Sequence, residues 1–456
     1  MHLTIEKLVY GGDGLARLPA NERGRGKAAF VPFVLEDEKI EATLLEEKPG
    51  FARAQVDQIL EASSQRIQPR CPYFQNCGGC HYQHSEYEHQ LEIKATILKE
   101  NLRRIAKFEL DQELKIHPSL PWNYRNRARL KVQGAPEFVL GYFKFNSHEL
   151  LPVEECPISS PLINRAIAAL WQLGRTGRVP AGIREIEFFV NADDTQLLAE
   201  VYCAAEIGNA TEQFASELKN VLLEIVGFVF FDARASETET QVDPRRLGVS
   251  GAVNLVYTSK LASYRVSAGA FFQVNRYLTD ELVNIVVYGQ RGGGREAHRT
   301  AGEACPERNR RDAGAAGTAL DLYAGVGLFS SVLNREFARV IAVESSPTSH
   351  ADLLYNSPAN VKAVRATTEQ YLENAAGKLR LELVVVDPPR SGLGEKVIRG
   401  LVKLNPPRIT YVSCDPATLS RDLARLLHSG YRVEEAHLVD LFPQTYHLES
   451  VFHLVR

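Results

Sequence analysis

Apolar and polar positions alternate along residues 1–61, in stretches separated by glycine-rich turns. The stretches read LTIEKLVYGGDGLARL, KAAFVPFVL, KIEATLLEEK and ARAQVDQIL. A period of two is typical of strands that bury one face. We therefore expect a small β-barrel domain over residues 1–61 and no helix within it.

The pattern changes in the next part of the chain. In EYEHQLEIKATILKENLRRIA, apolar residues recur at near-helical spacing, which predicts one amphipathic helix over about 86–110. From about 122 to 270, strand patterns such as RARLKVQG, IREIEFFVN and QLLAEVYCA mix with helical ones such as PLINRAIAALWQLG. This mixture predicts a central α+β domain, to which we assign residues 62–266. The helix at 86–110 can pack on the domain that follows.

Apolar strands and helical stretches alternate in the last third of the sequence. TALDLYAG, RVIAVES, LELVVVDPP and RITYVSCD are the strand candidates. Their order predicts an α/β domain with a doubly wound, Rossmann-like parallel sheet over residues 267–456. The segment 289–317 is rich in Gly, Ala and Arg without apolar periodicity, so we expect a flexible excursion in which Cys305 has no role.

Composition limits the class of protein. The chain has 456 residues, of which 45% are hydrophobic and 24% charged, and its apolar runs are too short to span a bilayer. The first residues lack the layout of a secretory signal. We expect a cytoplasmic monomer with no membrane role. The net charge of -3 neither supports nor excludes nucleic-acid binding, for which a local basic stripe matters more.

A glycine turn after the strand TALDLYAG indicates a nucleotide-type ligand. Gly325 and Gly327 allow close approach of the backbone, and Glu344 at the end of the next strand can accept hydrogen bonds from a ribose. The G-x-G-x-x-G pattern of dinucleotide sites is absent. S-adenosylmethionine, which has a ribose and no phosphate, fits this pattern better than a dinucleotide.

Two further residues follow buried strands at the edge where open α/β sheets bind ligands. Asp387 in VVVDPPR is either a turn residue before proline or part of that site. Cys414 in ITYVSCDPATLSRDL is either a small core residue or a reactive thiol, and a helix N-terminus just after it would stabilise the thiolate. Their position at this edge favours the functional interpretation of both.

A thiol, a methyl donor and a base together suit one reaction. Carbon 5 of uracil is a weak nucleophile until a thiolate adds to carbon 6, after which a base must remove the carbon 5 proton. Near the C-terminus, DLFPQTYHLESV offers Asp440, His447 and Glu449 as candidate bases.

The chain resembles the RNA uracil-5-methyltransferases. The matching stretches are FFQVN, DLYAGVGLFS, VIAVES, DPPRSGL, YVSCDPATLSRD and DLFPQTYHLESV, in the family's order. The resemblance implies that Cys414 is the nucleophile and Glu449 the base. It also implies a cofactor pocket lined by Gln273, Tyr323, Glu344 and Asp387. Ala324 departs from the family, because a cysteine is frequent there, and so does Thr367, which we leave out of the pocket.

The stretch CPYFQNCGGC holds three of the seven cysteines, and a fourth lies at a distance in EECPIS. Four thiolates hold either zinc or an iron-sulfur cluster, and spacing alone does not separate these. One branch of the family carries this pattern around a 4Fe-4S cluster. By resemblance, the cluster ligands are Cys71, Cys77, Cys80 and Cys156. Cys203 is interpreted as a core residue of a strand.

Features for RNA binding are expected in two places. YRNRARLKV puts Arg127, Arg129 and Lys131, with Arg125, on one face of a strand, which is either a solvated surface or a basic face for phosphates. Trp122 and Tyr124 beside it offer base-stacking surfaces.

The N-terminal barrel resembles the TRAM domain, an RNA-binding module. By resemblance, this module and the cysteine set favour 23S ribosomal RNA as substrate. A transfer-RNA enzyme, or a non-catalytic RNA-binding protein with an inert methyltransferase domain, are the alternatives.

Overall fold

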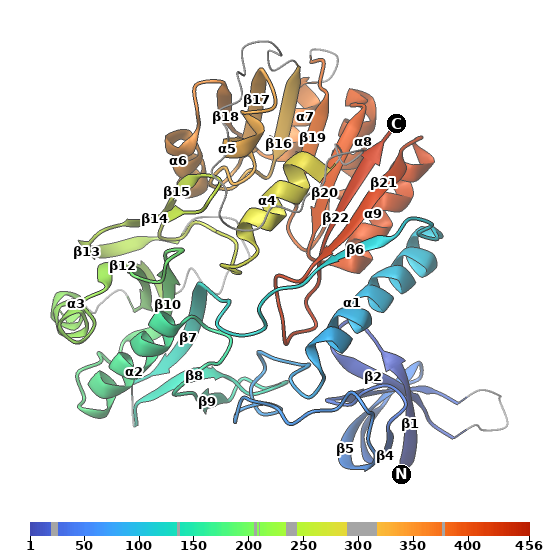
Figure 1. Ribbon diagram of the computed structural model, residues 1–456. Helices are drawn as coiled ribbons and strands as arrows, with labels where there is room; N and C mark the ends of the chain where they lie inside the picture. The colour runs from blue at the N-terminus through green and yellow to red at the C-terminus, as the bar shows by residue number, and fades with distance from the viewer. Residues whose placement is uncertain are drawn as a thin grey trace, which may run out of the picture.

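The computed structural model describes residues 1–19, 26–134, 137–204, 208, 210–233, 244–289, 317–375 and 379–456. The predicted excursion over 289–317 lies outside the described residues except at its two ends, and Cys305 lies outside them as well. In these ranges no helix combines the length and the apolar character that crossing a membrane requires. Figure 1 shows a barrel, a mixed sheet and a larger sheet flanked by helices.

The N-terminal strands close into a barrel in the order β1-β2-β3-β5-β4, which confirms the predicted small barrel. Alternate side chains such as Leu3 and Ile5 of β1 point inward and are buried. Gly14 is required for closure, because a Cβ atom there would lie 2.4 Å from the Val34 side chain. The strands are β1 (His2–Leu8), β2 (Asp13–Arg17), β3 (Ala28–Pro32), β4 (Lys39–Glu47) and β5 (Phe51–Glu61).

A mixed sheet occupies the middle of the chain, in the order β13-β12-β11-β10-β7-β8-β9. Helices α2 (Pro161–Arg175) and α3 (Ala210–Val221) pack on one of its faces. Helix α2 starts where the sequence signals it, since Ser160 accepts a hydrogen bond from the Ile163 amide and Pro161 occupies the first turn. The strands are β7 (Arg127–Gln133), β8 (Val139–Phe143), β9 (Leu150–Pro152), β10 (Ile183–Val190), β11 (Leu197–Cys203), β12 (Ile225–Asp232) and β13 (Arg246–Gly251).

The C-terminal sheet has the order β18-β17-β16-β19-β20-β22-β21-β6. The first five strands in this order, from β18 through β17, β16 and β19 to β20, are parallel to one another. Strand β22 lies between β20 and β21 and is antiparallel to both. This confirms the predicted doubly wound sheet. The strands from the C-terminal third are β16 (Thr318–Leu322), β17 (Arg339–Glu344), β18 (Val361–Arg365), β19 (Leu383–Val386), β20 (Arg408–Ser413), β21 (Arg432–Val439) and β22 (Glu449–Val455).

Helices cover both faces of this sheet. Leu282, Val332 and Leu353 come from the helices of one face and share a core with the hairpin β14 (Asn254–Thr258) and β15 (Ser263–Ser267). The helices of this face are α4 (Thr279–Tyr288), α5 (Ser330–Leu333) and α6 (Pro347–Asn356). Helices α7 (Thr368–Ala375), α8 (Gly394–Leu404) and α9 (Pro416–His428) pack into the core of the other face.

Two elements that precede the central sheet in sequence belong to the C-terminal sheet in space. Helix α1 (Tyr87–Asn101), extended by a π-helical turn (Leu102–Ala106), packs against α9. Strand β6 (Leu114–His117) then pairs with β21 in parallel and forms the edge of the sheet. The predicted helix is present but ends at residue 106, and β6 has no counterpart in the sequence patterns, because only Leu114 of its residues is buried.

Candidate active site

The turn after β16 brings the predicted cofactor residues to the ends of the parallel strands. Tyr323, Gly325 and Gly327 adopt left-handed conformations, with φ of 62°, 55° and 94°. A Cβ atom on Gly325 would meet nothing within 4 Å, so the turn leaves room for a ligand. The Gly325 amide donates to Glu344 Oε2 at 2.9 Å, which ties the turn to the end of β17.

Glu344 is half-buried, and its carboxylate binds two backbone amides. The second bond comes from the Ser346 amide to Oε1 at 2.7 Å. A carboxylate has about four lone-pair positions, so both oxygens can accept further hydrogen bonds from a ribose. The predicted residue therefore lies at the carboxyl end of the sheet with acceptor positions still available, although its contacts here are to the backbone.

Two acidic side chains lie at the ends of adjacent strands. Burial raises the pKa of Asp321 in β16 to about 7, although the Ser330 hydroxyl bonds to its carboxylate. Burial and the charge of Asp321 likewise raise the pKa of Asp387, which follows β19, to about 7. The Asp387 amide donates to the Leu322 carbonyl at 3.4 Å. A bound cation at this edge would favour the ionised carboxylates. Asp321 was not among the predicted site residues.

Gln273 lies in the buried segment before α4. Its backbone carbonyl accepts a hydrogen bond of 2.9 Å from the Asn126 side chain, and the Asn126 amide donates to the Val274 carbonyl at 2.9 Å. Phe272 beside it packs in the same core as Ala324 of the glycine turn. Asn126 belongs to YRNRARLKV, which we interpreted only as a basic strand. The buried asparagine in that motif was the signal for its positioning role.

Cys414 follows β20 directly, at the carboxyl edge of the sheet. Burial and the charges of Glu449 and Asp387 raise the pKa of its thiol to about 12, and Arg390 acts in the opposite direction. Burial and these two acids oppose the thiolate that the sequence led us to expect beside a helix N-terminus. The first amides of α9 are also already bonded, because Asp415 Oδ1 accepts from Ala417 at 3.0 Å and from Thr418 at 2.8 Å.

Glu449 begins β22 and is 4% exposed. Ser413 of β20 pairs with Ser450 of β22, and the two strands are antiparallel. Cys414, which follows Ser413, therefore lies beside Glu449, which precedes Ser450. Burial and the charge of Asp387 raise the pKa of Glu449 well above its ordinary value, while Arg390 lowers it. Arg390 thus faces both groups, and the sequence reasoning did not single it out.

The other two candidate bases are in different situations. Asp440 is fully paired, with Lys94 Nζ at 2.6 Å and the Tyr87 hydroxyl at 2.8 Å. Burial lowers the pKa of His447 to about 3, so it is neutral at physiological pH. Of the three, Glu449 is the acid adjacent to Cys414.

The four predicted cluster cysteines lie near one another, in two segments of the chain. Cys71 and Cys156 are partly buried against the cluster that contains Cys80. Burial and the charges of Cys156 and Cys71 raise the pKa of Cys77 to about 11, so the thiols lie within electrostatic reach of one another. Four clustered thiols from two separate segments suit a metal cluster.

The cysteine set is also attached to the segment that leads to Glu449. The amides of His81 and Tyr82, directly after Cys80, both donate to the Gln444 carbonyl, at 2.9 and 3.0 Å. Gln90 of α1 bonds to the Gln444 side chain as well. The position of the loop before β22 therefore depends on the segment that carries the cysteines.

The predicted basic face is wrong as a surface of free cations. Arg127 pairs with Glu187 at 3.1 Å, and Arg129 and Lys131 both pair with Glu185 of the neighbouring strand β10. Arg125 lies before β7, near Cys156. Tyr124 is fully buried and offers no surface for base stacking. The acids that neutralise this strand are distant in sequence, so the strand alone could not reveal them.

Comparisons with known proteins agree with this arrangement. Residues 310–456 match the tRNA (Uracil-5-)-methyltransferase family. An uncharacterized RNA methyltransferase of Aquifex aeolicus (strain VF5) is 33% identical over 99% of this chain and 97% of its own length. The 23S rRNA (uracil(1939)-C(5))-methyltransferase RlmD of Shewanella frigidimarina (strain NCIMB 400) is 28% identical over 99% of this chain and 94% of its own. The crystal structure of Pyrococcus abyssi tRNA (uracil-54, C5)-methyltransferase with S-adenosyl-L-homocysteine is similar in fold, with a TM-score of 0.71 at 22% sequence identity. The similarity covers 100% of this chain and 100% of that one.

The sheet order and the barrel thus define an α/β methyltransferase with an N-terminal five-stranded barrel. The chain belongs to the RNA uracil-5-methyltransferase family, because the similarity extends over its full length. It is an S-adenosylmethionine-dependent enzyme that methylates carbon 5 of uracil in RNA.

Proposed function

We propose that this enzyme methylates a uridine of 23S ribosomal RNA, with Cys414 as nucleophile and Glu449 as base. The full-length similarity to the Shewanella frigidimarina enzyme, whose name specifies 23S rRNA, supports the substrate. The likeness to the Pyrococcus abyssi enzyme, at 22% identity, concerns the fold and carries no substrate assignment. Transfer RNA is the alternative substrate that the experiment below decides.

The adjacency of Cys414 and Glu449 supports the covalent mechanism. After its proton passes to solvent, the Cys414 thiolate adds through sulfur to carbon 6 of the uracil, and the ring becomes an enolate with electron density at carbon 5. Bound S-adenosylmethionine would supply the methyl group to carbon 5, and S-adenosylhomocysteine would leave with the electron pair of the broken sulfur–methyl bond. Glu449 then accepts the carbon 5 proton, and the electron pair of that C–H bond returns to the ring and expels the Cys414 thiolate.

Formation of the thiolate requires a change in the environment of Cys414, whose pKa of about 12 keeps it protonated in the free protein. Arg390 is the side chain that favours the thiolate, and the acidic neighbours oppose it. We propose that the positive charge of Arg390 favours the Cys414 thiolate when the uridine is bound. The target uridine must also leave its stack to reach a half-buried thiol.

We propose that Gln273, Tyr323, Glu344 and Asp387 hold S-adenosylmethionine. The open space at Gly325 and the acidic residues at three adjacent strand ends fit a ligand with a ribose and positive charge. Gln273 lies on the segment before α4, whose backbone is bonded to the Asn126 side chain.

We further propose that Cys71, Cys77, Cys80 and Cys156 bind a 4Fe-4S cluster. Such a cluster would fix the segment that holds the Gln444 carbonyl, and so the loop before Glu449. We also propose that the chain is organised in three units, 1–61, 62–266 and 267–456, in which α1 and β6 of the second unit pack on the third.

The substrate is tested by nucleoside mass spectrometry with site mapping on RNA from a deletion strain. One 5-methyluridine is expected to disappear from 23S ribosomal RNA and to return with the wild-type gene, but not with Cys414→Ala. Loss of the methyl group from transfer RNA instead would overturn the proposed substrate and leave the covalent mechanism intact.

A further inference from the structure

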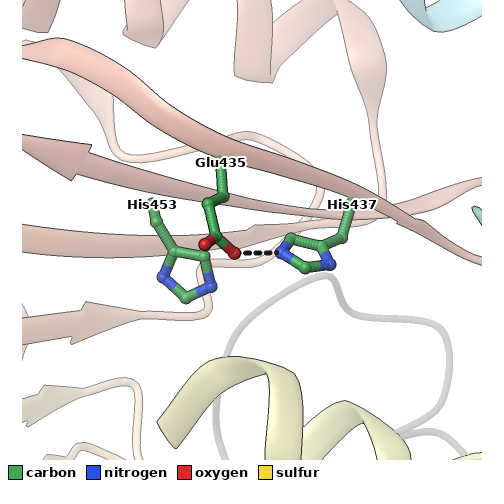
Figure 2. A group of neighbouring side chains, drawn as sticks. All are labelled: Glu435, His437 and His453. Carbon is green, nitrogen blue, oxygen red and sulfur yellow. Dashed lines mark hydrogen bonds and ion pairs between the residues drawn. The ribbon is translucent and has the colours of Figure 1, made fainter. Parts of the chain in front are cut away.

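Three potential metal ligands meet on the face of the sheet that α4 covers. Glu435 and His437 come from β21 and His453 from β22, and one ligand atom of each lies within 4.8 Å of the others. Figure 2 shows the three side chains pointing toward one another. Glu435 and His453 are paired across the two strands, so this convergence follows from the register of the sheet.

Each histidine has one ring nitrogen held by a neighbouring side chain. His453 Nδ1 lies 3.0 Å from Thr410 Oγ1. His437 Nδ1 lies 3.0 Å from His117 Nε2, and His117 Nδ1 lies 3.1 Å from Glu281 Oε1. Such partners are typical of metal-binding histidines, because each can accept a proton from Nδ1, and in that tautomer the Nε2 lone pair is available for an ion.

The remaining nitrogens face the centre of the group. His437 Nε2 lies 3.1 Å from Glu435 Oε2. His453 is fully buried, and within the described residues its Nε2 makes no hydrogen bond of normal geometry. The backbone carbonyl of Ile285 is near enough to the ring to favour its protonated form. A buried, unsatisfied nitrogen is costly unless a ligand occupies it.

The set offers two imidazoles and one carboxylate. A fourth group approaches the carboxylate, because Lys115 Nζ lies 3.0 Å from Glu435 Oε2 and competes with a cation for that oxygen.

We propose that Glu435, His437 and His453 bind a divalent cation of the zinc type. Two imidazoles and one carboxylate suit zinc and leave a fourth position for water. The ion takes the place of the hydrogen bond between His437 Nε2 and Glu435 Oε2, and the single ring proton of His437 then lies on Nδ1, facing His117 Nε2. The Glu435 side chain is 17% exposed and provides the path of entry.

The site is separate from the reacting groups and has a structural role. His453 is four residues from Glu449 along β22, which corresponds to about 13 Å. The ion links β21 to β22 directly, and through His117 and Glu281 it links them to β6 and α4. It thus fastens the edge strand and one covering helix to the strand that begins with Glu449.

The test is a zinc titration of chelator-treated full-length protein, with zinc per chain measured by elemental analysis and affinity by calorimetry. Wild type is expected to bind one equivalent more than Glu435→Gln or His453→Gln, and to gain thermal stability on zinc addition. The exposed His428→Gln serves as the matched control and is expected to behave as wild type. Because every variant keeps all seven cysteines, zinc held by thiols cancels in the comparison.

Two further variants cover the case in which a ligand variant fails to fold. Thr410→Val keeps all three ligands and removes only the partner of His453 Nδ1, so the affinity is expected to fall by about 10- to 100-fold. Lys115→Met removes the ammonium 3.0 Å from Glu435 Oε2 and is expected to tighten binding. Equal zinc content and equal affinity in wild type, Glu435→Gln and Thr410→Val would overturn the proposal and leave a hydrogen-bonded network only.

Discussion

The hydroxyl of Tyr10 donates a hydrogen bond of 3.2 Å to the backbone carbonyl of Cys414, although the two residues are 404 positions apart. Tyr10 follows β1 of the barrel, and its ring also packs edge-on against Tyr446, with centroids 5.4 Å apart. The barrel is therefore in direct contact with the backbone of the proposed nucleophile and with the loop before Glu449. RNA bound by the barrel would be held in a fixed place relative to Cys414.

The contact can be tested with Tyr10→Phe, which keeps the ring and removes the hydrogen bond. A net contribution of about 0.5–1.5 kcal/mol predicts that turnover falls by roughly 2- to 12-fold. Cofactor affinity should stay unchanged, because the cofactor residues lie on other strands. Single-turnover methylation and calorimetry measure the two quantities. Tyr355→Phe, at an exposed position of α6, is the control, and a Tyr10→Phe enzyme as fast as this control would show that the bond does not position Cys414.

The roles of Cys414 and Glu449 differ in what each variant leaves behind. Cys414→Ser is expected to abolish both turnover and covalent RNA adduct, because a serine hydroxyl stays protonated and is a weaker nucleophile. Glu449→Gln should still permit attack and methyl transfer but stall before elimination. A denaturing gel would then show a stable complex with methylated RNA. Ordinary turnover by Cys414→Ser would contradict the covalent mechanism.

The patterns of the sequence predict the elements that are built from local signals. The barrel, the parallel strands and the glycine turn each have such a signal, because alternation, apolar runs and glycine positions act over a few residues. Glu344 and Asp387 were predicted at strand ends for the same reason, and both lie there.

What the sequence did not reveal depends on partners that are distant along the chain. Lys94 occupies the apolar face of α1 and is completely buried, and its ammonium is paired with Asp440 and bonded to the Phe442 carbonyl. Arg127 and Arg129 suggest a basic surface in the sequence. In the structure Glu187 and Glu185 of the neighbouring strand neutralise them. The thiolate expected at Cys414 is opposed by Glu449 and Asp387, from two other strands. Each of these depends on long-range contacts that no periodicity encodes.

The cysteine set yields a prediction about colour and composition. Protein purified without oxygen should be brown and contain iron and sulfide in equal amounts. Replacing Cys71, Cys77, Cys80 or Cys156 by Ser should remove the iron, whereas Cys203→Ala, at a buried position of β11, should retain it. Since the His81 and Tyr82 amides hold Gln444, loss of the cluster should also slow methylation. Colourless wild-type protein with stoichiometric zinc at these thiols would refute the cluster.

Asp387 predicts how cofactor affinity depends on pH. Its pKa of about 7 means that the carboxylate is ionised above neutrality and protonated below it. Affinity for the cationic cofactor should therefore fall by roughly tenfold as the pH drops from about 8 to about 6. Calorimetry across this range measures the effect. Asp387→Asn should bind weakly with a flat profile, and Asp321→Asn should move the midpoint to lower pH, because the charge of Asp321 raises the pKa of Asp387. A flat wild-type profile would argue against this role.

The buried pair of Lys94 and Asp440 predicts a large effect on stability. Both side chains are 0% exposed, and their charged atoms lie 2.6 Å apart. The ammonium also donates to the Phe442 carbonyl at 3.0 Å, so the pair joins α1 to the loop before Glu449. Lys94→Met leaves a buried carboxylate without its cation, which is expected to cost about 3–5 kcal/mol of unfolding free energy. Asp440→Asn in the same chain removes that charge and should restore most of the loss.

Urea unfolding followed by circular dichroism measures these differences. Lys99→Met, at an exposed position of the same helix, is the control, because it removes an equal charge from solvent and should change stability by well under about 1 kcal/mol. If Lys94→Met were as stable as this control, the ion pair would not hold α1 against the loop before Glu449. If the double variant were no more stable than Lys94→Met, the loss would come from packing around the lysine stem rather than from the unpaired carboxylate. Methylation measured on the stable double variant then reports whether joining α1 to the loop matters for the chemistry at Glu449.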